Sequence, residues 1–117
     1  SEAKKISEKN KEKRKFDNMT KQEKYEISRF NDYVVGINKV IQARADDGYF
    51  FIDKTFKTQL KVNEVDELLK TENNIAEALK NYFQLKGFKV IKCDSYKDYS
   101  NVGTVGWIGI KTLIDWS

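Results

Sequence analysis

The most informative absence in this 117-residue chain is histidine, which does not occur at all. Without imidazole there is no His general acid or base, no Ser-His or Cys-His nucleophile pair, and no zinc site with a His ligand. Cysteine occurs once, at Cys93, so an intramolecular disulfide is excluded as well. Few enzymes work without these groups. We therefore expect a protein that is not an enzyme and that has no metal site and no cofactor.

Proline is also missing, and arginine is scarce, with three Arg against 19 Lys. AT-rich genomes produce this bias, so the lysine count is weaker evidence for nucleic-acid binding than the same number of Arg would be. No segment reaches the roughly 18 apolar residues of a membrane helix, and the first residues lack the charged-then-apolar pattern of a signal peptide. We expect no membrane association and no secretion by a signal peptide.

Charge is distributed unevenly along the chain. Residues 1–24 hold nine Lys or Arg and five Asp or Glu, whereas residues 25–117 hold thirteen of each. The first segment therefore accounts for the whole formal net charge of +4. A basic segment that is poor in apolar residues thus precedes a neutral segment that contains nearly all the large apolar side chains.

The basic segment has too few apolar residues to fold by itself. Residues 1–18 contain only three apolar side chains, which are Ala3, Ile6 and Phe16. Such a segment cannot offset the entropy of ordering by burying surface. We expect a basic N-terminal arm over residues 1–19 that is flexible or ordered by a partner, followed by a single domain over residues 20–117. Because many arm residues favour helix, a docked arm is expected to extend the following helix.

A helix is predicted directly after the arm. Thr20 followed by Glu23 has the spacing of a capping box. An apolar stripe with spacings of three and four then follows: Ile27, Phe30, Val34, Ile37 and Ile41. The helix should end near Ala45, before a turn at residues 46–48. Because the stripe spans only about two heptads, a core-facing helix is favoured over a coiled coil.

The remaining elements follow from shorter patterns. Residues 49–52 form an aromatic and β-branched run that predicts a strand, and residues 53–62 alternate poorly and predict the strand end and a loop. A short helical turn is expected to open at Asn63. A longer helix is expected from about Asn74 to a stop at Gly87.

Two strands complete the predicted fold. They are placed at residues 88–93 and at about 105–116, with a polar loop over residues 94–103, and are expected to form an antiparallel hairpin. The element order α-β-α-β-β predicts an α+β domain of two layers. In this domain two main helices pack on a small, mostly antiparallel three-stranded sheet. Cys93, inside an apolar strand, is expected to be an inert core thiol.

The cationic residues of the arm are the first candidate binding site. They are Lys4, Lys5, Lys9, Lys11, Lys13, Arg14 and Lys15. Such residues can dock on an acidic protein surface, contact a phosphate backbone with release of counterions, or form a solvated tail. Four acidic residues lie among them, which weakens the phosphate interpretation. Docking on a protein is the first choice.

A second candidate site is an interface on the last strand and the loop before it. Trp107 and Leu113 fall on the face opposite the isoleucines of the same strand. A sheet covered on one side should be polar on its open face, so an apolar second face suggests contact with another subunit or protein. Covering by loops or by the arm is the alternative. Tyr96 and Tyr99 complete the interface candidates, because tyrosine is enriched at interfaces.

Two other patterns near the last strand are weaker evidence for a functional site. Gly103, Gly106 and Gly109 recur every third residue, without the strand–turn–helix context of a phosphate-binding loop. We interpret them as bulges or as places where another backbone approaches closely. Asp94 and Asp98 are only two carboxylates, fewer than the six or more oxygen ligands that Ca²⁺ takes, so no metal site is assigned to them.

Three segments carry a resemblance to a known family. They are residues 41–50 (IQARADDGYF), a helix running through small residues into a turn and strand; residues 79–90 (LKNYFQLKGFKV), a helix ending in Gly-aromatic-x-Val; and residues 113–116 (LIDW), a terminal strand ending in Trp. With these segments, residues 27–117 resemble a small α/β module found among accessory virion proteins of tailed bacteriophages. The basic arm and the tyrosine-containing loop depart from that pattern.

The resemblance implies a non-catalytic structural or assembly role, often in oligomers, and a location in the virion or the host cytoplasm. We therefore expect a viral structural or assembly protein that binds neighbouring subunits or a larger complex through its arm and its apolar sheet face. The expected partners are copies of itself or other virion subunits, and no small-molecule substrate is expected. The alternative is a small nucleic-acid-binding regulatory protein, in which the arm contacts phosphates while Tyr96 and Tyr99 stack on bases.

Overall fold

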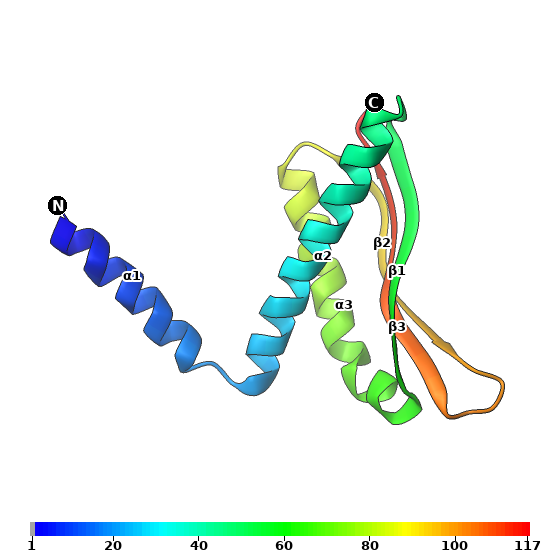
Figure 1. Cartoon of the computed structure of the whole chain (residues 1–117), viewed down its shortest axis with the longest axis horizontal. Coiled ribbons are helices and arrows are strands. Elements are labelled where there is room, and N and C mark those ends of the chain that lie inside the picture. The colour runs from blue at the N-terminus through cyan, green and yellow to red at the C-terminus, as the bar shows by residue number, and fades with distance from the viewer. Residues whose placement is uncertain (1) are drawn as a thin grey trace.

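The computed structural model describes residues 2–117, apart from the side chains at positions 12, 13 and 16. Its elements in chain order are helix α1 (Glu2–Asp17), helix α2 (Lys21–Asp46), strand β1 (Phe51–Lys61), helix α3 (Val62–Leu85), strand β2 (Lys89–Tyr99) and strand β3 (Val105–Asp115). Helices α2 and α3 lie together on one side of the sheet, while α1 projects away from this body (Figure 1). The predicted two-layer α+β class is confirmed.

The sheet places its last strand in the middle. The strand order is β1-β3-β2, and β3 is antiparallel to both neighbours, so the predicted hairpin of β2 and β3 is confirmed. Ile52 of β1 and Val90 of β2 both pair with Ile114 of β3, which sets these three side chains on the helix-covered face. Ile91 is an extra residue at a β-bulge between Val90 and Lys92.

The core lies between this face and the two helices. It is built from buried side chains of all five elements of the body: Tyr33, Ile37, Ile52, Ile75, Ala76, Leu79, Phe83, Cys93, Ile110 and Ile114. A row of edge-to-face aromatic contacts runs along its border through Phe30, Tyr82, Phe83, Phe88 and Trp116. The apolar stripe of α2 therefore faces the core, as the sequence predicts.

Strand β1 and helix α3 are both longer than predicted. Strand β1 continues for 11 residues, although the sequence predicts a strand end and loop after residue 52. Its helix-facing positions include Lys54 and Thr58, so the apolar alternation is lost while the pairing with β3 continues. Helix α3 is a single helix, because its polar residues Thr71 and Glu72 are buried against α2 rather than exposed in a loop.

The predicted polar loop at residues 94–103 is also wrong in its first half. Residues 94–99 continue β2 and pair in register with β3, as far as Tyr99 opposite Gly106. The backbone amide and carbonyl groups of this segment that face β3 are paired by the hydrogen bonds of the hairpin, so its polar side chains do not prevent it from forming a strand. The turn of the hairpin is confined to residues 100–104.

In the single chain, helix α1 is separate from α2, and extension of α2 by a docked arm stays a prediction. The two helices are joined by residues 18–20, and Thr20 is the N-cap of α2 with an extended backbone. The Thr20 hydroxyl accepts a hydrogen bond from the Glu23 amide at 3.1 Å and donates one to the Glu23 carboxylate at 3.0 Å. Thr20 is therefore confirmed as the N-cap, while the Glu23 carboxylate of the predicted capping box contacts the Thr20 hydroxyl rather than its backbone amide.

Candidate functional site

The cationic residues of the arm lie on α1, and those whose side chains are described are exposed. Every described side chain of α1 is exposed, including six of the seven predicted cations: Lys4, Lys5, Lys9, Lys11, Arg14 and Lys15. The side chain of Lys13 lies outside the described residues. Helical spacing places Lys4, Lys11 and Lys15 on one side of the helix. The arm thus offers cationic groups with little apolar area, since Ile6 is its one exposed large apolar side chain among those described.

The outer face of the sheet carries few apolar side chains, and two of them lie on the central strand β3. Trp107 stands between Gln59 of β1 and Asp98 of β2 in the register. Leu113 likewise stands between Asp53 and Lys92. Polar and charged side chains on both edge strands therefore border a narrow strip of β3, in which Lys111 lies between Trp107 and Leu113, rather than the broad apolar face that the sequence suggests.

Tyr96 and Tyr99 do not form a common patch. Residues three apart on a strand face opposite sides of the sheet. Tyr96 lies on the outer face opposite Gly109, where the Lys111 ammonium is 5.3 Å from its ring. The Tyr99 hydroxyl instead donates a hydrogen bond to Asp66 of α3, and this bond raises the Tyr99 pKa. Only Tyr96 therefore shares the outer face with Trp107.

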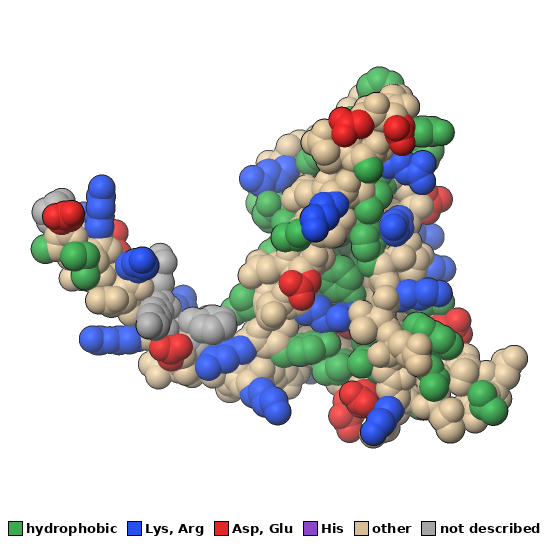
Figure 2. Space-filling view, viewed as in Figure 1, with side chains coloured by type: hydrophobic (Ala, Val, Ile, Leu, Met, Phe, Trp, Pro, Cys, Tyr) green, Lys and Arg blue, Asp and Glu red, His purple; other side chains and the backbone are tan. Residues whose placement is uncertain are grey.

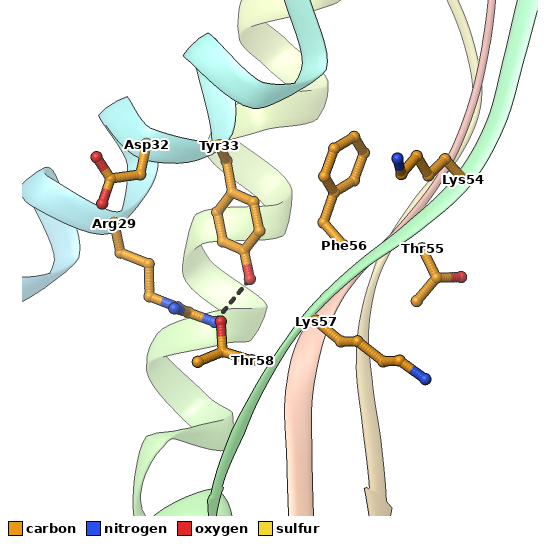
Figure 3. Close-up of a pocket in the computed structure, with 8 residues that line it drawn as sticks. All are labelled: Arg29, Asp32, Tyr33, Lys54, Thr55, Phe56, Lys57 and Thr58. Atoms are coloured by element: carbon orange, nitrogen blue, oxygen red, sulfur yellow. Dashed lines mark hydrogen bonds between the residues drawn. The ribbon is translucent and has the colours of Figure 1, made fainter. Parts of the chain in front are cut away.

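A buried polar cluster joins α2 to α3. Glu72 is fully buried, and its carboxylate accepts hydrogen bonds from the Arg29 Nε and from the Tyr33 hydroxyl, the latter at 2.8 Å. A second guanidinium nitrogen of Arg29 donates to the Tyr33 hydroxyl at 2.8 Å, and Figure 3 shows this contact. Sequence reasoning missed this cluster. The available signal was an Arg and a Tyr four residues apart on α2, beside the apolar stripe.

The electrostatics of this cluster fix its protonation. Burial and the Glu72 charge raise the pKa of Tyr33 well above its ordinary value, which keeps it a neutral phenol. Burial lowers the pKa of Arg29, but the hydrogen bond to Glu72 and neighbouring groups outweigh this effect and raise it overall. Arg29 is therefore a cation that balances the Glu72 carboxylate. The three groups form a charge-balanced linkage, and neither Arg29 nor Tyr33 exchanges a proton near neutral pH.

A pocket of about 440 Å³ lies beside this cluster, between α2 and β1. Its lining consists of Arg29, Asp32, Tyr33, Lys54, Thr55, Phe56, Lys57 and Thr58 (Figure 3). The side chain of Lys57 extends away from α2, and Arg29 is already neutralised by Glu72. Within the described part of the chain, no group of three His, Cys, Asp or Glu side chains can hold a metal ion. Asp32 and Lys54 are the pocket's other charged lining residues, and their opposite charges favour no single charge on a ligand.

An exposed aromatic cluster lies where α2 turns into β1. Tyr49, Phe50 and Phe51 are exposed by 47%, 60% and 46%. Tyr49 packs edge-to-face on Phe51, and the Arg44 guanidinium lies 5.3 Å from the Tyr49 ring centre. Figure 2 shows hydrophobic side chains at this end of the body. The sequence places these aromatics in a strand with two apolar faces, but does not reveal that they remain uncovered.

Cys93 is buried, as the sequence predicts. Its thiol donates a weak hydrogen bond to the Ala76 carbonyl at 3.5 Å. Burial, followed by the nearby Asp94 charge, raises the Cys93 pKa to about 11. The thiolate that would act as a nucleophile is therefore scarce at neutral pH.

Comparisons with protein-family models, with curated proteins and with solved structures returned no match. Across residues 2–117, none of the helices combines the length and the apolar character needed to span a membrane. The function is therefore inferred from the geometry of the chain itself.

Proposed function

We propose that this chain is a non-catalytic structural module that binds neighbouring subunits of an assembly, with α1 as the connecting element. The observation that carries this proposal is the exposure of α1. It is a helix of 16 residues whose described side chains are all exposed, so it gains almost nothing from the body of its own chain. Isolated helices of about this length are marginal in water. Docking on a partner supplies the missing stabilisation.

The exposed apolar groups of the body support the same function. Trp107 and Leu113 are half-buried on the outer sheet face, with Lys111 between them, whereas the aromatic cluster of Tyr49, Phe50 and Phe51 forms uncovered apolar surface at one end of the body. Contiguous apolar surface of this kind marks contact sites. The partners we propose are copies of this chain or other virion subunits, in the virion or the host cytoplasm, in keeping with the resemblance to phage accessory proteins.

Deleting residues 1–19 tests the role of α1. This deletion keeps Thr20 and therefore leaves the N-cap of α2 intact. We expect light scattering at micromolar concentration to show oligomers for the full chain and monomers for the deletion variant. The unfolding midpoint of the deleted monomer in urea should match that of the full chain diluted to its monomeric state, because α1 buries no described side chain. The same number of subunits for the two chains at every concentration would contradict the proposal.

Binding of single-stranded nucleic acid is a second candidate function, supported by one observation on the outer sheet face. The Lys57 ammonium lies 5.9 Å from the Trp107 ring centre, and Lys111 is similarly placed over Tyr96. Aromatic rings flanked by cations are the platforms on which bases stack, while lysines of the arm would contact phosphates.

A fluorescent oligothymidine separates this candidate from the first. Under the assembly function we expect no measurable binding at about 50 mM salt, where phosphate contacts are strong. Binding that falls steeply with salt would instead establish the second candidate. In that case Trp107→Ala should weaken it roughly 5- to 100-fold. Leu113→Ala, on the same strip, is the matched control and should leave it unchanged.

A further inference from the structure

A groove of about 360 Å³ lies between α2 and α3, on the helical side of the body. It is lined by Glu23, Glu26, Ile27, Phe30, Ile75 and Ala78. Ile75 is buried at its floor and Phe30 is half-buried, whereas Ile27 is exposed by 37%. Figure 2 shows hydrophobic side chains gathered between these two helices. The groove is therefore an apolar depression left open in the single chain.

The charge of the groove has one sign. Among the described residues, the ionisable ones that line it are Glu23 and Glu26, and none of the described cations does so. An apolar floor with carboxylates at its border suits a cationic segment that carries a few apolar groups. Helix α1 is a segment of this kind, because its described side chains include six cations and the exposed Ile6. Its length of about 24 Å is ample to cross the groove.

The link between α1 and α2 favours the α1 of another copy over the chain's own. The Asn18 amide donates to the Arg14 carbonyl at 3.0 Å and so continues the last turn of α1. Thr20 is fixed as the N-cap of α2. Only Met19 remains between these two hydrogen-bonded ends. A link this short restricts how far α1 can fold back onto its own groove, whereas a second copy delivers its α1 with the link unchanged.

We propose that this groove receives the helix α1 of a second copy, in a reciprocal exchange. Each chain then donates one arm and accepts one, which is the self-complementary contact of a two-fold dimer. The inference rests on the proposed function, because it requires α1 to be the connecting element. It adds the receiving surface and the identity of the partner.

A groove variant tests the receiving surface. Glu26→Lys combined with Ala78→Lys places two cations in the groove and leaves the Glu23 contacts of the N-cap intact. The matched control, Glu67→Lys combined with Gln84→Lys, makes the same change in net charge at exposed α3 positions outside the groove. We expect the groove variant to weaken dimerisation by about tenfold or more, because like charges then face each other. The control should dimerise like the unmodified chain.

A charge-swapped pair supplies the positive result. A second variant carries Lys4→Glu, Lys11→Glu and Lys15→Glu on the arm. We expect this arm variant and the groove variant each to be monomeric, and an equimolar mixture to form a heterodimer, because the acidic arm fits the basic groove and the basic arm fits the acidic groove. Analytical ultracentrifugation measures all three samples.

The outcomes separate this inference from the proposed function. If removing residues 1–19 abolishes oligomers but the groove variant still forms them, α1 docks elsewhere, so this inference fails and the proposed function stands. If removing residues 1–19 changes nothing, the proposed function fails as well. A full chain that stays monomeric at all concentrations, or a mixture that forms no heterodimer, also overturns the exchange between copies.

Discussion

Replacing Gly109 by alanine should destabilise the domain by at least about 3 kcal/mol, at the upper end of what overpacking costs or beyond it. A Cβ atom at this position would overlap the carbonyl oxygen of Phe56 and would lie 2.7 Å from the Cα of Lys57. Both are backbone atoms of the paired strand β1, so no side-chain rotation relieves the overlap. Because β3 is the central strand, moving it away from β1 also disturbs its pairing with β2.

Gly36→Ala is the matched control for this substitution. Gly36 lies inside α2, and a Cβ there would meet the ring of Phe56 at 3.7 Å, an ordinary contact distance. Alanine is favoured over glycine in a helix by about 0.5–1 kcal/mol, so we expect this variant to be more stable than the unmodified chain. Urea denaturation followed by circular dichroism measures both. A Gly109→Ala chain as stable as the unmodified one would show that the strands separate easily here.

Breaking the buried ion pair should have the second largest effect. Arg29→Met leaves the Glu72 carboxylate fully buried, with the Tyr33 hydroxyl as its remaining described donor. Removing one partner of a buried pair typically costs about 3–5 kcal/mol. Replacing both partners, as in Arg29→Met combined with Glu72→Leu, should recover most of that loss, because an apolar pair of similar size often substitutes for a buried salt bridge.

A thermodynamic cycle built from these chains provides the measurement. The free energies of unfolding of the two single variants and the double variant give the coupling between Arg29 and Glu72. Tyr33→Phe is the control, since it removes one hydroxyl and keeps the ion pair, and it should cost about 1 kcal/mol. If the double variant loses as much as the two single variants together, the charges are not coupled, and Arg29 and Glu72 do not stabilise the domain as an ion pair.

Local patterns in the sequence were sufficient to predict the helix α2 and the overall class. The capping box at Thr20 and the spacing of the apolar stripe depend only on residues within a few turns of each other. Strand β1 was underestimated because Lys54 and Thr58 occupy helix-facing positions at the edge of the sheet, where the pairing partner lies some 50 residues away in the sequence. The point where β1 ends depends on its pairing with β3, and this pairing cannot be predicted from the residues of β1 alone.

The same limitation explains what was missed at the candidate sites. From the sequence alone, Glu72 is expected at the surface, because nothing shows that Arg29 lies against it. The polar residues around Glu72 therefore suggest a break in α3 that the structure does not contain. The cations of the arm follow from composition alone. The groove combines residues from two helices separated by about 50 positions, and no single segment carries its apolar floor together with its acidic border.

The position of β3 between β1 and β2 also has a consequence for synthesis. The two edge strands do not pair with each other, and β3 is made after both of them. While the ribosome still holds residues 105–115, the nascent chain can form helices but has no hydrogen-bonded sheet on which to pack them. Acquisition of the native structure is therefore delayed until β3 emerges, and a transcript that stops before Val105 yields two strands with no partner.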